Sequence, residues 1–227
     1  MVKRCDSDSN FFGILIGEFI NGECAGAVEK KFQLLYSKSD FDNLTFIDGY
    51  HKSYSEIKVV YSKTLKAVNK IDKPIFIKSI YEEVDFDLSD LYALAFESGK
   101  FSRFFLDKNF GENNFKKLYQ EWINNSLNKK IADDILVYIY NDKIIGFVTY
   151  KVSNEIATVG LIAVDEEHQG KGIGKNLLNF AENKLLEQRV VELQIPTQKI
   201  NEHACSFYQK AGYAPKHKTY IQHFWKK

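Results

Sequence analysis

The stretch ATVGLIAVDEEHQGKGIG, residues 157–174, holds the pattern that decides how this chain folds. It opens with an apolar run typical of a buried strand and ends with alternating glycines at Gly170, Gly172 and Gly174. The next segment, Lys175–Leu186, has apolar residues at helical spacing. The order predicts a strand, a glycine-rich turn and a helix. Such a turn presents bare backbone N–H groups and the positive end of a helix dipole, an arrangement that binds phosphate groups.

The spacing of the glycines excludes two common phosphate loops. A dinucleotide-binding fold requires G-x-G-x-x-G near the start of a βαβ unit, one residue more than this chain has. A nucleoside triphosphate loop requires G-x-x-x-x-G-K-S/T, whereas Gly174 and Lys175 are followed by Asn176. The pattern that remains is Q/R-x-x-G-x-G/A, which Gln169, Gly172 and Gly174 match.

A second motif follows about thirty residues later. The pattern N-x-x-A-x-x-x-Y-x-x-x-G-F/Y is matched by Asn201, Ala204, Tyr208, Gly212 and Tyr213. An Asn at a helix N-terminus caps the backbone and can donate to an amide carbonyl. Asn201, Ala204 and Tyr208 share one helix face because they lie three, four and seven residues apart. The motif predicts a helix that presents a small residue and a Tyr hydroxyl to a ligand.

Together the two motifs resemble those of the GNAT superfamily of N-acetyltransferases, which bind acetyl-CoA. The predicted element order from residue 75 onward is β-α-α-β-β-β-α-β-α-β, which is also the order of that superfamily and covers about 150 residues. The resemblance implies an α/β (α+β) fold with a central mixed, mostly antiparallel sheet that is splayed between two parallel strands.

Hydrophobic periodicity and turn residues place the elements behind this order. The predicted strands are Pro74–Ile80, Ile135–Tyr140, Ile144–Lys151, Ile156–Val164, Val190–Ile195 and Tyr220–Trp225. The predicted helices are Leu88–Glu97, Asn113–Leu127, 175–188 and Asn201–Ala211.

The N-terminal part holds no chemical motif. The polar segment that ends at Pro74 predicts a boundary, with a small strand-rich subdomain over residues 1–72 and the acetyltransferase domain over residues 73–227. We expect strands at Phe11–Ile20 and Phe32–Tyr36. Ser53–Lys66 alternates in part and fits either a helix or a strand.

The resemblance implies roles for individual residues. Tyr208 is the implied general acid, which protonates the departing CoA thiolate, a thiol with an ordinary pKa of about 8.5. A backbone N–H near Ile162–Val164, freed by a bulge, would polarise the thioester carbonyl. The implied acetyl-CoA contacts are Ile162, Ala163, Val164, Gln169, Gly170, Lys171, Gly172, Ile173, Gly174, Lys175, Asn201 and Ala204.

The sequence does not identify the general base. His168 lies in the phosphate loop, where we expect it to be exposed and inert. Glu82, Glu83 and Asp85 follow the first strand of the acetyltransferase part and are candidates that the sequence does not rank.

The acceptor rests on a looser resemblance. Glu97–Phe104 and the helix Asn113–Leu127 look like the helix–loop–helix of enzymes that N-acetylate dTDP-linked amino-dideoxy sugars, of the dTDP-fucosamine acetyltransferase type, which serve O-antigen or surface polysaccharide biosynthesis. In that reading Ser102 and Arg103 face the acceptor, and Arg103 pairs with the nucleotide diphosphate or makes a structural ion pair. The alternatives are acetylation of a protein amine or a small polyamine, and a non-catalytic acetyl-CoA-binding regulator.

Composition limits the remaining possibilities. The 227 residues carry a net charge of +1, which removes a broad electrostatic case for nucleic-acid or membrane binding. No segment has transmembrane length, so we expect a cytoplasmic protein. Cys5, Cys24 and Cys205 form neither a disulfide framework nor a metal pattern, and no metal is expected. A homodimer is the default expectation.

Overall fold

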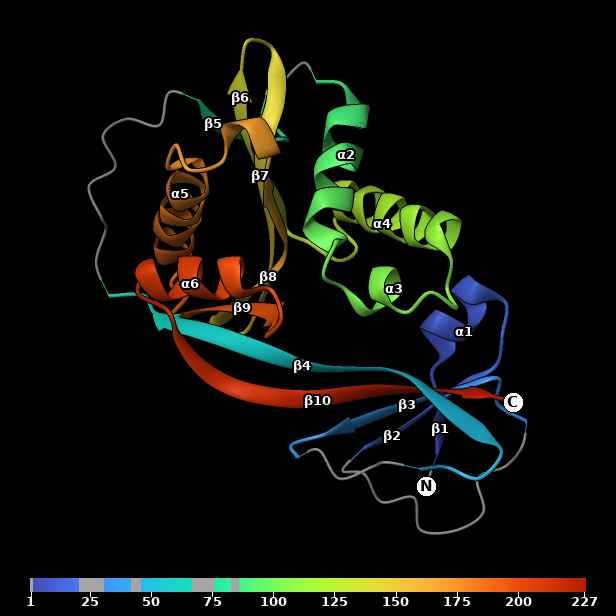
Figure 1. Cartoon of the computed structure of the whole chain (residues 1–227). Coiled ribbons are helices and arrows are strands. Elements are labelled where there is room, and N and C mark those ends of the chain that lie inside the picture. Colours follow the sequence, from blue (N-terminus) through green and yellow to red (C-terminus); the bar gives the residue numbers. More distant parts are fainter. Residues whose placement is uncertain (1, 21–30, 42–45, 67–75, 83–85) are drawn as a thin grey trace.

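The computed structural model describes residues 2–20, 31–41, 46–66, 76–82 and 86–227. Within them, ten strands form one mixed sheet in the order β1-β2-β3-β10-β4-β9-β8-β7-β6-β5 (Figure 1). The strands are β1 (Lys3–Arg4), β2 (Ile16–Ile20), β3 (Leu34–Ser39), β4 (Tyr50–Thr64), β5 (Ile77–Ser79), β6 (Asp134–Tyr140), β7 (Lys143–Ser153), β8 (Ile156–Val164), β9 (Glu192–Gln198) and β10 (Ala214–Lys226). The helices are α1 (Asp6–Phe12), α2 (Leu88–Gly99), α3 (Arg103–Leu106), α4 (Glu112–Leu127), α5 (Ile173–Glu187) and α6 (Glu202–Lys210), with a short 3₁₀ turn η1 at Glu166–His168.

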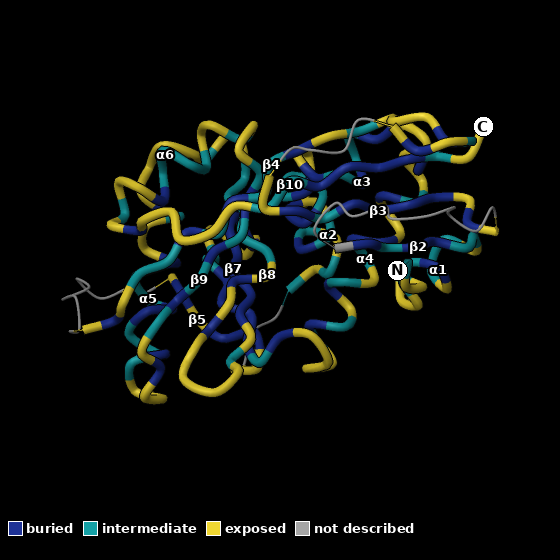
Figure 2. The backbone as a smooth tube through the Cα atoms, turned by 90° about the horizontal axis from the view of Figure 1, so that it is seen from below, coloured by how far each residue is buried: buried dark blue, intermediate teal, exposed yellow. Residues whose placement is uncertain are grey.

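Helices cover both faces of the sheet. Helices α5 and α6 lie on one face, and α2, α3 and α4 lie on the other (Figure 1). Buried backbone runs along the strands between these layers (Figure 2). The mixed α/β architecture and the element order from β5 to β10 confirm the fold class predicted from the sequence.

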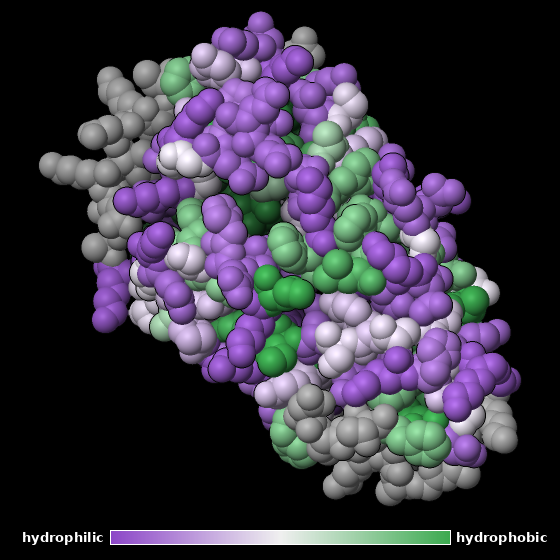
Figure 3. Space-filling view, viewed as in Figure 1, coloured by the Kyte–Doolittle hydropathy of each residue, from purple (hydrophilic) through white to green (hydrophobic). Residues whose placement is uncertain are grey.

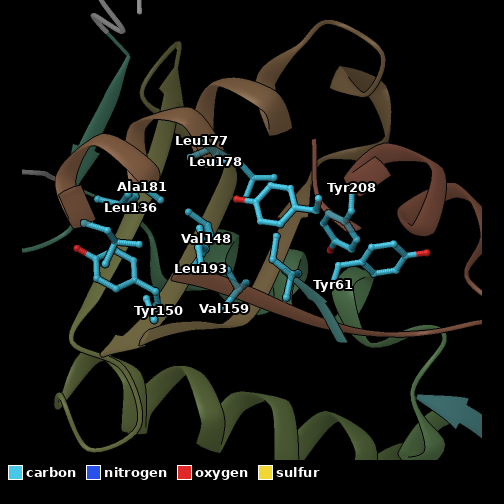
Figure 4. Close-up of a cluster of buried hydrophobic side chains, with 14 of the residues drawn as sticks. Tyr61, Leu136, Val148, Tyr150, Val159, Leu177, Leu178, Ala181, Leu193 and Tyr208 are labelled. Carbon is cyan, nitrogen blue, oxygen red and sulfur yellow. The ribbon is translucent and has the colours of Figure 1, made fainter. Parts of the chain in front are cut away.

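A hydrophobic core lies between α5 and the sheet. Leu177, Leu178, Ala181 and Leu185 repeat at helical spacing and are fully buried. They belong to the cluster of Figure 4, where Val148 and Leu193 project toward them from the sheet. The equivalent core on the other face contains side chains from α2, α4, β6 and β7: Leu91, Leu94, Phe115, Tyr119, Ile123, Ile135 and Phe147.

Strands β8 and β9 separate after a short parallel pairing. Only Ile156–Thr158 pairs with Glu192–Gln194, and the strands then diverge. The register of β7 against β8 also shifts between Val159 and Ile162, which marks a bulge at residues 160–161. The splay predicted for two parallel strands is therefore present, with its bulge just before the predicted segment Ile162–Val164.

Strand β4 supplies the next strand of the sheet beside β9. It is 15 residues long and runs antiparallel to both β9 and β10. The segment Ser53–Lys66, which fitted either a helix or a strand, thus forms the greater part of a long strand. The expected boundary between residues 72 and 73 lies outside the described residues, and the division into two units stays a prediction.

Several sequence predictions need correction, among them the start of the last strand, which is Ala214 and not Tyr220. Phe11–Ile20 is not one strand, because α1 ends at Phe12, Gly13 adopts a left-handed conformation (φ 67°), and β2 begins only at Ile16. Strand β9 does not end at Pro196 but continues to Gln198. A proline is tolerated there because β9 is by then paired with β4 alone and has one unpaired edge. None of the described helices is long and apolar enough to cross a membrane.

A buried ion pair fixes β4 to the helical layer. The Lys63 ammonium donates to both carboxylate oxygens of Glu182 at 2.9 and 2.7 Å, and the Tyr213 hydroxyl donates to the same carboxylate at 2.7 Å. Glu182 is only 3% exposed. Lys63 also donates to the Ala211 carbonyl at 3.3 Å. This network joins β4, α5 and the end of α6.

Lys63→Ala is expected to lower the free energy of unfolding by about 3 kcal/mol, because it leaves the Glu182 carboxylate buried without its counter-charge. Urea denaturation measures the loss. Lys116→Ala is the control, because it breaks an exposed pair with Glu112 whose contribution is below about 1 kcal/mol. Equal losses in the two variants would mean that this network does not hold β4 in place.

Candidate active site

A cleft of about 930 Å³ occupies the gap between β8 and β9. Residues 159–164 of β8 and 195–198 of β9 line it, together with side chains from both helical layers. Tyr208 comes from the α6 side, while Tyr119 and Phe104 come from the side of α3 and α4. Figure 3 shows hydrophobic side chains gathered around a hollow in the middle of this face, with hydrophilic ones around them. The cleft therefore connects the two faces of the sheet.

The bulge in β8 depends on a close approach between two strands. The Leu161 amide donates to the Thr149 hydroxyl at 2.9 Å instead of to a backbone carbonyl. A Cβ atom at Gly160 would lie 2.8 Å from the same hydroxyl oxygen, so a larger residue would displace Thr149. Beyond this point, Ile162, Ala163 and Val164 are half-buried and line the cleft.

The glycine loop leads directly into α5. Gly172 is the N-cap residue with φ 80°, and Gly170 has φ 75°, both in the left-handed region. A Cβ at either position would meet no atom within 4 Å, so the loop is open on its outer side. Gly174 packs differently, since a Cβ there would lie 3.2 Å from the Phe207 ring. The helix begins two residues earlier than the predicted Lys175 and directs its first amides into the cleft region.

Side-chain bonds shape the turn before the glycines. The Asp165 carboxylate accepts from the Glu167 amide at 3.1 Å and contacts His168 Nδ1 at 2.7 Å. The Gln169 side-chain amide donates to the Val164 carbonyl at 3.1 Å. His168 is half-buried, whereas the sequence predicted an exposed side chain, and its contact with Asp165 helps to close the turn. Gln169 fixes the loop to the end of β8.

The second motif forms the wall opposite the loop. Asn201 caps α6 by accepting a hydrogen bond from the Ala204 amide at 3.1 Å. Tyr208 is 4% exposed, and burial raises the pKa of its hydroxyl well above the ordinary value. Its ring lies 5.8 Å from that of Tyr61, and the two are neighbours in Figure 4. A phenol in this environment stays protonated at neutral pH.

Ser102 and Arg103 stand where α3 begins. Ser102 is 6% exposed, and its buried Oγ lies next to the Tyr119 hydroxyl. Arg103 Nη2 pairs with Asp8 at 3.3 Å, and the guanidinium stacks 4.3 Å from the Tyr36 ring centre. Its Nη1 is buried and has no hydrogen-bond partner among the described residues. Arg103 thus makes a structural ion pair with α1 and also keeps one donor group unused at the cleft.

The cleft wall includes charged residues that the sequence did not single out. Lys38 of β3 and both Glu56 and Lys58 of β4 line it. Glu56 is 9% exposed and accepts a hydrogen bond from the Tyr54 hydroxyl at 2.9 Å. No local pattern marks these residues, because their position depends on the pairing of β4 with β9 and β10.

The structure brings most of the sequence-predicted residues into this one cleft. Those that line it are Ser102, Arg103, Ile162, Ala163, Val164, Gln169, Gly170, Gly172, Ile173, Gly174, Lys175, Asn201, Ala204 and Tyr208. Lys171 is exposed and is not among the lining residues, nor is Glu82. Glu83 and Asp85 lie outside the described residues. The described residues hold no group of three or more His, Cys, Asp or Glu side chains suited to a metal ion.

Solved structures share this fold. A conserved protein of unknown function from Staphylococcus epidermidis has a TM-score of 0.60 and 16% identity over 86% of this chain and 74% of its own. A putative GNAT-family acetyltransferase from Novosphingobium aromaticivorans has a TM-score of 0.57 and 11% identity over the same shares of the two chains.

Sequence relatives match over shorter segments. The spore coat polysaccharide biosynthesis protein SpsD of Bacillus subtilis is 27% identical over 139 residues, which are 61% of this chain and 48% of SpsD. Streptothricin acetyltransferase of Escherichia coli is 33% identical over 60 residues, which are 26% of this chain and 34% of that enzyme. The chain thus spans about half or less of the length of these two curated relatives. The model of the acetyltransferase (GNAT) family matches residues 88–213, more than half of the chain, and the chain therefore belongs to the GNAT acetyltransferase family.

Proposed function

We propose that this protein transfers the acetyl group of acetyl-CoA to the amino group of a dTDP-linked amino-dideoxy sugar by direct attack in a ternary complex. The observation that carries the proposal is the continuous cleft, which has a glycine loop at one end and a cationic wall at the other. One end suits the phosphates of CoA, and the other suits the phosphates of a nucleotide sugar.

The donor end fits acetyl-CoA by its backbone. The loop at Gly170 and Gly172 is open to a bulky anion, and α5 is a 15-residue helix whose N-terminal amides have no intrahelical partner. Gln169–Lys175 would hold the pyrophosphate there. Asn201 and Ala204 line the path between the loop and Tyr208. Bound acetyl-CoA would supply its activated acetyl thioester to the gap between β8 and β9.

The acceptor end carries cationic side chains, two of which also have carboxylate partners, since Lys38 pairs with Glu18 and Arg103 pairs with Asp8. Lys38, Lys58 and Arg103 line the same wall. Burial lowers the pKa of the Lys58 ammonium, and the charges of Lys38 and Arg103 lower it further. The Lys58 ammonium and the Arg103 guanidinium can donate to an anionic ligand at this wall, which also contains the Glu56 carboxylate. These donors suit a diphosphate.

Aromatic side chains and a relative add support for a nucleotide sugar. Phe101, Phe104, Tyr119 and Trp122 line the acceptor end, where a base or a sugar ring can stack on them. The similarity to SpsD, a protein named for spore coat polysaccharide biosynthesis, fits a role in surface sugar chemistry.

The proposed chemistry uses Tyr208 as the general acid. A CoA thiolate that leaves needs a proton, and the raised pKa of the buried Tyr208 hydroxyl keeps that proton in place until the C–S bond breaks. An amide N–H of Ile162–Val164, next to the bulge, is suited to polarise the thioester carbonyl.

The acceptor is tested by thiol release from acetyl-CoA with a panel of amines. We expect dTDP-3-amino or dTDP-4-amino dideoxyhexoses to accelerate release far more than spermidine, lysine peptides or the free amino sugars. Lys58→Met is expected to raise KM for the nucleotide sugar about tenfold or more and to leave the acetyl-CoA Kd unchanged. Faster turnover with a polyamine or peptide would replace the acceptor proposal, and no turnover with any amine would favour a non-catalytic regulator.

Gly172→Ala is expected to raise the acetyl-CoA Kd about tenfold, because a left-handed conformation costs an Ala roughly 1–2 kcal/mol and the loop relaxes away from the phosphates. Isothermal titration calorimetry measures the change. Gly13→Ala is the matched control: Gly13 has φ 67°, its Cβ would also be in open space, and it ends α1 far from the cleft loop. A similar loss in both variants would indicate general destabilisation.

Tyr208→Phe is expected to lower kcat by about 100-fold or more, because it removes the proton donor, and to leave the acetyl-CoA Kd unchanged. Steady-state kinetics and calorimetry measure the two quantities. Tyr61→Phe removes a hydroxyl from the neighbouring ring of the same hydrophobic cluster and is expected to keep kcat within about threefold. An unchanged kcat in Tyr208→Phe would remove this residue from the mechanism.

A further inference from the structure

Amine acetylation requires a proton acceptor as well as a proton donor. A primary amine that attacks the thioester carries two protons on its nitrogen, and the amide product keeps only one. A side chain that can accept the other proton is expected at the cleft. Carboxylates and imidazoles are side chains that can accept this proton, and five described Glu and His residues line the cleft: Glu56, Glu97, Glu166, His168 and His203.

Four of the five stand in unsuitable places. Glu166 and His168 belong to the turn that leads into the glycine loop, at the end of the cleft that suits phosphate. His203 is exposed on the first turn of α6. Glu97 lies at the end of α2 and pairs with the Lys100 ammonium. Glu56 is the buried carboxylate of this set.

Glu56 lies on the acceptor side of the sheet. It pairs with Ile221 across β4 and β10, two residues from the point where Lys58 pairs with Gln198 at the end of β9. Ile221 and Gln198 also line the cleft. Glu56 therefore stands beside the open end of the splay, where an amine must arrive to reach a thioester held between β8 and β9.

The groups around Glu56 come from several elements. Tyr54, on its own strand, donates to Oε2 at 2.9 Å, and Lys58 follows on the same face of β4. Arg103 of α3 and Tyr119 of α4 face it across the cleft, and Lys38 of β3 lies near Lys58. Burial raises the pKa of the Glu56 carboxyl, while Tyr54, Arg103 and Lys58 act to lower it. The carboxyl is thus a stronger base than an exposed Glu.

We propose that Glu56 is the general base that accepts the proton of the attacking amine. The step balances: the N–C bond forms and the C–S bond breaks, the amine proton goes to the Glu56 carboxylate, and the Tyr208 proton goes to the CoA thiolate. Both residues return to their starting states by exchange with water. The proposal rests on the acetyl transfer proposed above but not on the identity of the acceptor.

The first test is Glu56→Gln, assayed with the fastest amine of the panel. We expect kcat to fall about 100-fold or more while the acetyl-CoA Kd stays the same. Slow hydrolysis of acetyl-CoA, with water in place of the amine, should fall with it, so the test does not depend on the acceptor. Glu112→Gln removes an exposed carboxylate that does not line the cleft and should keep kcat within about threefold. An unchanged kcat and hydrolysis rate in Glu56→Gln overturn the proposal and leave the acceptor assignment intact.

The second test separates a base from a merely structural carboxylate. The rate of acetyl-CoA hydrolysis, which involves no amine, should fall as pH drops through the Glu56 pKa, and Glu56→Gln should lack this limb. Tyr54→Phe removes a hydrogen bond that lowers the pKa of Glu56, so it should move the limb to higher pH. Carboxyl carbon-13 titration of the enzyme without acetyl-CoA should show one signal whose pKa is higher in Tyr54→Phe than in the wild type. That signal should be absent in Glu56→Gln. A limb that does not move in Tyr54→Phe contradicts the assignment.

Discussion

The separation of β8 from β9 is the constraint on which the rest of the site depends. The two strands share only three paired residues each, and afterwards the sheet has a gap in its middle. A gap in a sheet exposes backbone N–H and C=O groups that must find other partners. The Thr149 hydroxyl, which accepts from the Leu161 amide, provides one such partner. The cleft exists because the sheet remains open at this point without losing its other pairings.

Strand β4 makes this opening stable. It gives β9 a full antiparallel partner on the side away from the gap, over Lys58–Thr64 and Glu192–Gln198. Its other edge pairs with β10 from Tyr50 to Ser62, and the Lys63–Glu182 pair joins it to α5. The same strand also brings Glu56 and Lys58 to the cleft. One element of the N-terminal segment therefore closes the sheet and supplies charges to the site.

The sequence predicted the parts of the structure that depend on contacts between residues near one another in the chain. It predicted less well the parts that depend on contacts between distant residues. The glycine loop and the Asn201–Tyr213 motif are local, since each is a strand end or a helix start with its own caps, and both were found at the predicted places. Helix α1 was missed because seven residues show too little periodicity. β4 was ambiguous because its polar/apolar alternation, regular through Glu56 and Lys58, is broken by the apolar run Val59–Tyr61. Glu56 and Lys58 are the polar members of that alternation, and they line the cleft.

The two ends of the cleft therefore differ in how their specificity is encoded. The donor end is built almost entirely from residues 159–211, so a short stretch of sequence carries its chemistry. The acceptor end combines side chains from β3, β4, α3, α4 and β10, which are distant in sequence and meet only in the folded sheet. Changes in the N-terminal segment can thus alter the charge of the acceptor wall while the glycine loop stays the same. Family membership consequently supports the proposed donor, whereas the proposed acceptor depends on how β4 is placed in the sheet.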